Sequence, residues 1–150
     1  MKYISQRGLD LIKRFEGFSE KPYLCPAGVW TIGYGSTNNV DKDSKPVDKD
    51  EAETLLREAL MPITLDLNRI VPATLTQNQF DSLCSFCYNL GFGAFMSSTL
   101  RKVIERNPDD YEHIRKEFMR WVNVNGKKMN GLIKRREAEA DLYCACYEED

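Results

Sequence analysis

Residues 16–35 read EGFSEKPYLCPAGVWTIGYG, and this stretch decides the fold. Strand-forming residues lie on both sides of the Pro26-Ala27-Gly28 turn, so residues 23–34 are predicted to form a β-hairpin. Cys25 ends its first strand and Thr31 lies on its second. The hairpin therefore returns Thr31 and Cys25 toward Glu16, and the three side chains could together handle a proton or a water molecule.

An amphipathic helix precedes this stretch. Leu9, Ile12 and Phe15 recur at helical spacing, and Gly17 is typical of the residue after a helix end. Glu16 then belongs to the last turn, among apolar neighbours and at the negative end of the helix dipole. Both effects are expected to raise the pKa of Glu16, which suits a general acid.

Composition limits the function classes. The chain has 150 residues, which fit one domain with a core of its own, and a formal net charge of −2, which argues against general nucleic-acid binding. It has no apolar run of membrane-spanning length and no signal peptide in its first residues. We therefore expect a cytoplasmic protein, which another protein must release if its target lies outside. We further expect a monomer without cofactor or metal.

The five cysteines are odd in number, which argues against a disulfide framework. Cys84 and Cys87 have C-x-x-C spacing but lie in a helical, apolar pattern, so they are predicted to be buried. Cys144 and Cys146 receive no role.

Beyond the hairpin, residues 36–46 are predicted to be a loop or a third short strand, and Asp48 with Glu51 predicts the start of a helix over 48–70 with a kink at Pro62. The remainder is predicted to be helical. Its densest positive cluster is Lys127, Lys128, Lys134, Arg135 and Arg136. This cluster is interpreted either as a solvated surface, with Arg135 pairing to Glu139, or as a surface that attracts an anionic polymer.

Several motifs occur in a fixed order along the chain. Eight residues separate Glu16 from Cys25, and five separate Cys25 from Thr31, within Phe-Glu-Gly and Gly-Val-Trp-Thr-Ile-Gly-Tyr-Gly. Further motifs are QFDSL at 79–83, SFCYNLG at 85–91, Ser98-Thr99-Leu100 and GLIKRREAE at 131–139. With these motifs the chain closely resembles the phage-type lysozymes (endolysins, glycoside hydrolase family 24) over almost its whole length.

The resemblance implies an α+β, lysozyme-like fold with its active cleft between two lobes. The single domain would comprise a β-containing lobe at about 17–47, a connecting helix at about 48–70, and a helical lobe at about 71–150 that includes the N-terminal helix. The implied activity is bacteriolytic hydrolysis of the β-1,4 bond between N-acetylmuramic acid and N-acetylglucosamine in peptidoglycan. A holin partner would release the enzyme from the host cytoplasm to the wall.

By the same resemblance, Glu16 is the general acid, position 25 handles the attacking water or the sugar cation, and Thr31 orients that water. Tyr34, Gly35, Ser36 and Asn89 are candidate substrate-binding residues. Most members carry Asp at the second position, and a subset carry Cys, as here. A carboxylate near Cys25 is expected to raise its pKa and keep the thiol mostly neutral at pH 7.

Alternatives stay open for these residues. Cys25 could act as a thiolate base, as a nucleophile, or only in packing, and the stereochemical outcome is left open with a lean to inversion. Glu16 could be a surface carboxylate and Thr31 an ordinary strand residue. The rival functions are a lytic transglycosylase on the same bond and a non-catalytic peptidoglycan-binding protein.

Overall fold

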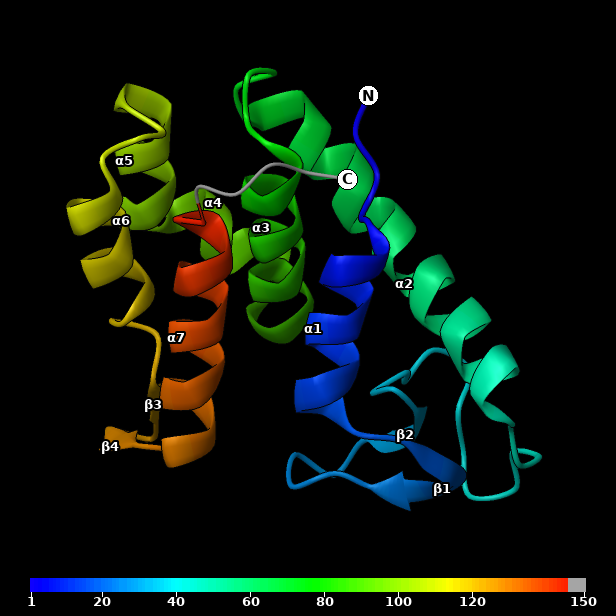
Figure 1. The fold of residues 1–150 in the computed structure, drawn as a ribbon. Helices are drawn as coiled ribbons and strands as arrows, with labels where there is room; N and C mark the ends of the chain where they lie inside the picture. Colours follow the sequence, from blue (N-terminus) through cyan, green and yellow to red (C-terminus); the bar gives the residue numbers. More distant parts are fainter. Residues whose placement is uncertain (146–150) are drawn as a thin grey trace. The chain divides into compact units, whose positions relative to one another are not determined.

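The computed structural model describes residues 1–145 (Figure 1), and the chain divides into two compact units. Unit 1 comprises Met1–Leu11 and Ile63–Asp150, and unit 2 comprises Ile12–Pro62. Helices α1 (Gln6–Glu16) and α2 (Lys49–Ile70) each run through the division without a break. Cys146 lies outside the described residues.

Unit 2 contains the predicted hairpin. Strand β1 (Ser19–Leu24) pairs antiparallel with β2 (Trp30–Gly33), with Tyr23 opposite Thr31 and Leu24 opposite Trp30. The pairing shifts register between Ser19 and Tyr23. In the segment 36–46, the structure has a loop, with an isolated bridge between Ile32 and Ser36 at its start.

The start of α2 follows its sequence signature. The Asp48 carboxylate accepts from the Glu51 backbone N–H (2.8 Å), and the Glu51 carboxylate accepts from the Asp48 N–H (3.3 Å). This reciprocal arrangement is a capping box, as predicted. Pro62 lies inside the helix, which continues to Ile70.

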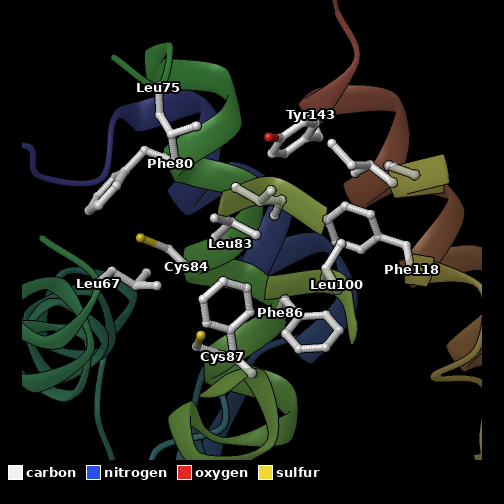
Figure 2. Close-up of a cluster of buried hydrophobic side chains, with 14 of the residues drawn as sticks. Leu67, Leu75, Phe80, Leu83, Cys84, Phe86, Cys87, Leu100, Phe118 and Tyr143 are labelled. Carbon is white, nitrogen blue, oxygen red and sulfur yellow. The ribbon is translucent and has the colours of Figure 1, made fainter. Parts of the chain in front are cut away.

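Unit 1 is mostly helical, and its central helix is α3. Helix α7 packs along α3 (Figure 1). Figure 2 shows the apolar core around α3. In this core, the ring of Phe86 makes edge-on contacts with those of Phe95, Phe118 and Trp121. The elements of this unit after α2 are α3 (Gln77–Leu90), α4 (Phe92–Ser97), α5 (Thr99–Arg106), α6 (Tyr111–Phe118), β3 (Asn123–Val124), β4 (Lys127–Lys128) and α7 (Asn130–Tyr143).

Cys84 and Cys87 are both buried in this core (Figure 2), which confirms their predicted packing role. Within residues 1–145 the cysteines are free thiols, and no group of three or more His, Cys, Asp or Glu side chains could hold a metal ion.

Candidate active site

Glu16 is the last residue of α1. The backbone N–H of Gly17 donates to the Lys13 carbonyl at 2.9 Å, and Gly17 has a φ of +70°, a conformation that favours glycine. The chain therefore leaves the helix immediately after Glu16 and enters β1 at Ser19. The Glu16 side chain is half-buried rather than fully buried.

Cys25 begins the turn of the hairpin. Its carbonyl accepts from the Gly28 N–H at 2.8 Å, and its N–H donates to the Val29 carbonyl at 3.0 Å. Gly28 has a φ of +78°, which closes the turn in the left-handed region. The Pro-Ala-Gly sequence thus folds as predicted, and it fixes the backbone around the half-buried Cys25.

Backbone groups lower the pKa of the Cys25 thiol. The largest cause is a hydrogen bond from the backbone of Val29, with further contributions from the backbone of Ala27 and the hydroxyl of Thr31; partial desolvation acts in the opposite direction. Successive N–H groups directed at one atom favour a negative charge there. The expectation that Cys25 has a raised pKa is therefore wrong, because these donors stabilise the thiolate.

Thr31 pairs with Tyr23 across the hairpin, and its hydroxyl reaches the Cys25 sulfur. It is 4% exposed, and its Oγ1 donates to the Val29 carbonyl at 3.0 Å. A hydroxyl carries a single proton, so it donates either to this carbonyl or to the Cys25 sulfur. The structure thus brings Cys25 and Thr31 together and connects both to the same turn. Glu16 lies at the other end of β1, before that strand begins at Ser19.

The predicted binding residues 34–36 follow β2. Tyr34 is buried, its ring lies 5.5 Å from that of Phe18, and the Lys13 ammonium lies 5.2 Å from its centre. Gly35 has a φ of +81°. Ser36 is 6% exposed, and its hydroxyl is without a hydrogen-bond partner in the part of the chain that the structure describes. A substrate-binding role for these three residues stays a prediction.

Asn89 belongs to unit 1, near the end of α3. Its side-chain oxygen accepts a hydrogen bond from Arg136 at 2.8 Å. Arg136 and Arg135 are buried on α7, where both pair with the fully buried Glu139. The predicted Arg135–Glu139 pair is confirmed. The prediction that Arg135 and Arg136 belong to a solvated basic surface is wrong, because both side chains are buried. Pairing with Glu139 offsets part of the charge of the two arginines, which makes their burial less costly.

Sequence reasoning missed two contributors to these sites. The first is the set of backbone N–H groups at Ala27 and Val29, whose signal is the Pro-Ala-Gly turn directly after Cys25. The second is the contact of Arg136 with Asn89, which joins residues 47 positions apart and has no local signal.

Known proteins share the sequence pattern of this chain. Residues 13–139 match the family model described as phage lysozyme. The chain belongs to the phage lysozyme family. It is 46% identical over 145 residues to the endolysin of Acyrthosiphon pisum secondary endosymbiont phage 1, covering 94% of this chain and 97% of that one.

Solved structures share the fold. The muramidase domain of SpmX from Asticaccaulis excentricus has a TM-score of 0.88 and 35% identity, and covers 97% of this chain and 99% of its own. A point mutant of P22 lysozyme has a TM-score of 0.82 and 32% identity, and covers 97% and 100%. The lysozyme-like α+β fold with a small hairpin is thereby confirmed.

As a phage lysozyme, the chain is a glycoside hydrolase of the endolysin type that degrades peptidoglycan and lyses the host cell. Among residues 1–145, none of the helices combines the length and the apolar character needed to cross a bilayer.

Proposed function

We propose that this lysozyme hydrolyses the β-1,4 bond between N-acetylmuramic acid and N-acetylglucosamine, with Glu16 as the general acid and Cys25 with Thr31 on the attacking water. It belongs, on this proposal, to the subset of the family that carries Cys at the second position. The observation that supports it most is the environment of the Cys25 sulfur, in which backbone donors and the Thr31 hydroxyl favour a thiolate.

In the proposed mechanism, Glu16 donates its proton to the glycosidic oxygen as the bond from the anomeric carbon to that oxygen breaks. A water molecule adds to the anomeric carbon, and the Cys25 thiolate takes its proton. Thr31 holds this water through its hydroxyl. Attack by water at the opposite face inverts the anomeric configuration. In the competing nucleophilic route, the sulfur bonds to the anomeric carbon and water later displaces it, with retention.

Digestion of purified peptidoglycan, followed by product mass and anomer analysis, tests the reaction. We expect each cleavage to add one water and to give the inverted anomer directly. An anhydro end would identify a lytic transglycosylase, a retained anomer would favour the nucleophilic route, and sedimentation with sacculi without release of fragments would identify a binding protein.

Substitutions test the residue roles in the same assay. Glu16→Gln keeps the side-chain size but cannot donate a carboxylic proton, so we expect loss of lysis with an unchanged unfolding midpoint. Cys25→Asp should keep substantial activity because a carboxylate is also a base, and Cys25→Ser should lose most of it. Lysis by Glu16→Gln would show that Glu16 is not the general acid. Equal activity of the wild type, Cys25→Asp and Cys25→Ser would show that Cys25 has no role in the mechanism.

The proposal extends to binding and release. Tyr34, Gly35, Ser36 and Asn89 contact the glycan, and the monomeric enzyme stays in the host cytoplasm until a holin opens a path to the wall. Expression in a Gram-negative host with and without a holin tests the release. We expect lysis only with the holin, or after chloroform treatment of cells that lack it; spontaneous lysis in its absence would contradict this route.

A further inference from the structure

Arg136 makes several contacts in the interior of unit 1. It is fully buried, and its Nε lies 2.6 Å from Oε1 of Glu139. Its Nη2 donates to Oε2 of Glu139 at 3.0 Å and to Oδ1 of Asn89 at 2.8 Å. The guanidinium also lies over the ring of Phe86, 5.2 Å from its centre. The guanidinium is therefore held from several sides in one orientation.

Glu139 is fixed as firmly as its partner. It is fully buried, and its Oε2 also accepts from the Ser85 hydroxyl at 2.5 Å and from Nε of Arg135 at 3.4 Å. Burial raises the pKa of Glu139, while the two arginines and the Ser85 hydroxyl act in the opposite direction. A charged network with this many partners moves little, because any displacement leaves a buried charge without compensation.

This network decides which way the Asn89 amide faces. A guanidinium has only donors, so the atom of Asn89 that meets Arg136 is the carbonyl oxygen. The NH2 group then points away from Arg136. Asn89 is half-buried, and no acceptor for this NH2 group is recorded among residues 1–145. Two donor hydrogens are thus presented in a fixed direction at the end of α3.

We propose that Arg136 is a positioning residue, which orients Asn89 so that its NH2 group donates to the acetamido carbonyl oxygen of an N-acetylated sugar in the glycan. The inference rests on the proposed function, since it needs the glycan as ligand. The acetamido oxygen is the strongest neutral acceptor on such a sugar. The reversed amide would present an oxygen instead, and would lose this hydrogen bond.

The test measures binding to purified sacculi by sedimentation, with every variant built on Glu16→Gln so that the glycan is not consumed. Asn89→Ala removes the donor and the acceptor. Asn89→Asp keeps an oxygen for Arg136 and removes only the donor. We expect both to weaken binding about three- to tenfold, as for the loss of one hydrogen bond, and we expect Asn89→Asp to melt no lower than the parent.

These outcomes decide whether Asn89 acts as a donor. Binding that is unchanged by Asn89→Ala overturns the proposal, whatever Asn89→Asp does, because the effect of the aspartate would then be charge repulsion. Weaker binding by Asn89→Ala together with normal binding by Asn89→Asp also overturns it, since the NH2 group would be dispensable.

A double-mutant cycle tests whether Arg136 acts through Asn89. Arg136→Lys keeps a positive partner for Glu139 but lacks the second arm that reaches Asn89. We expect it to weaken binding several-fold in the Glu16→Gln parent and to have little further effect in the Asn89→Ala background. If Arg136→Lys weakens binding equally with Asn89 present and with Asn89→Ala, Arg136 has only a structural role. That result overturns the proposal that Arg136 positions Asn89. If Arg136→Lys does not fold, Arg136→Met takes its place in the cycle, because Arg135 still pairs with Glu139 and the donor to Asn89 is removed.

Failure of this inference can be distinguished from failure of the proposed function. The enzyme with Glu16 intact is assayed on the same sacculi by mass analysis of released fragments. Release of hydrolytic fragments together with unchanged binding by Asn89→Ala rejects only the role of Asn89. Absence of any hydrolysis rejects the proposed function, whatever the binding data give.

Discussion

At position 25, neutral backbone groups stabilise a charge. Val29 and Ala27 contribute their N–H groups because the turn directs them at the sulfur. Desolvation opposes them, but it contributes less than the Val29 hydrogen bond, and the pKa of Cys25 is lowered. Cys84 and Cys87 show the opposite case, since burial in the core raises the pKa of both thiols. The reactive form of cysteine is the thiolate, so these environments predict different reactivities within one chain.

Alkylation by iodoacetamide, followed by peptide mass mapping across a pH series, measures this difference. Because the pKa of Cys25 is lowered, its labelling rate should reach half of its plateau at a lower pH than in the urea-denatured chain, where a free thiol titrates at about 8.5. Cys84 and Cys87 should resist labelling in the native protein.

The contribution of Thr31 is tested in the same series. Thr31→Val has nearly the same shape but cannot donate a hydrogen bond, so the Cys25 midpoint should move to higher pH. A native midpoint at or above that of the denatured chain would contradict the thiolate stabilisation derived from the turn.

A second residue-scale prediction concerns the close approach of Gly8 to α3. A Cβ at position 8 would lie 2.6 Å from Cγ1 of Ile4 and 2.8 Å from Cγ of Asp81. Asp81 cannot retreat, because its carboxylate accepts from the Ser5 backbone N–H at 3.0 Å and from Gln77 at 2.8 Å. Gly8→Ala should therefore lower the free energy of unfolding by about 1–3 kcal/mol, measured by urea denaturation.

Gly131 offers the matched control. It lies in the first turn of α7, and a Cβ there meets nothing within 4 Å. Gly131→Ala should be neutral or slightly stabilising, since alanine has the higher helix propensity. Equal effects of the two substitutions would show that the contacts around Gly8 adapt.

At the scale of one element, α3 depends on its first residues. Its capping box joins the Thr76 hydroxyl to the Gln79 N–H (3.1 Å) and the Gln79 side chain to the Thr76 N–H (2.9 Å). Thr76 is exposed, so Thr76→Ala leaves no cavity and should cost about 1 kcal/mol of unfolding free energy. Thr76→Ser should restore most of this loss, and the exposed Thr74 supplies a neutral Thr74→Ala control. If Thr76→Ser is as unstable as Thr76→Ala, the missing hydroxyl is not the cause of the lost unfolding free energy.

Elements with a strong local signal were predictable from the sequence. The capping boxes at Asp48 and Thr76 indicated the starts of α2 and α3, and the Pro-Ala-Gly turn indicated the hairpin. The β3–β4 hairpin was missed although Asn125-Gly126 is a typical turn sequence, and both residues have positive φ. Two-residue strands carry almost no alternating pattern.

Other elements depend on tertiary contacts. The helical pattern from Tyr111 to Val122 predicted a longer helix, but α6 ends at Phe118 and the ring of Trp121 packs on Phe86 instead. The sequence predicted a break over residues 89–93, but only Gly91 separates the end of α3 at Leu90 from the start of α4 at Phe92. In the candidate site, residue types and spacing indicated Cys25 and Thr31, whereas the lowered pKa of Cys25 could not be predicted because backbone donors leave no trace in side-chain chemistry.

At the scale of the whole molecule, the two units share two uninterrupted helices, α1 and α2. Melting either unit alone would break both helices in their middle, which costs hydrogen bonds on both sides of the division. We therefore expect the units to unfold together.

The two tryptophans allow a direct measurement, because Trp30 lies in unit 2 and Trp121 in unit 1. Trp121→Phe leaves a fluorescence reporter for unit 2, and Trp30→Phe leaves one for unit 1. In each variant, the fluorescence transition in urea should coincide with that of helical circular dichroism. A fluorescence midpoint separated from the circular dichroism midpoint in either variant would show that the units unfold independently.

The donors that surround the Cys25 sulfur belong to the main chain, and a main-chain N–H does not discriminate between a thiolate and another small anion. An aspartate at this position would be offered the same donors without any change in residues 26–31. On the proposed role of position 25, replacement of cysteine by aspartate, or the reverse, would thus need no compensating substitution in the turn.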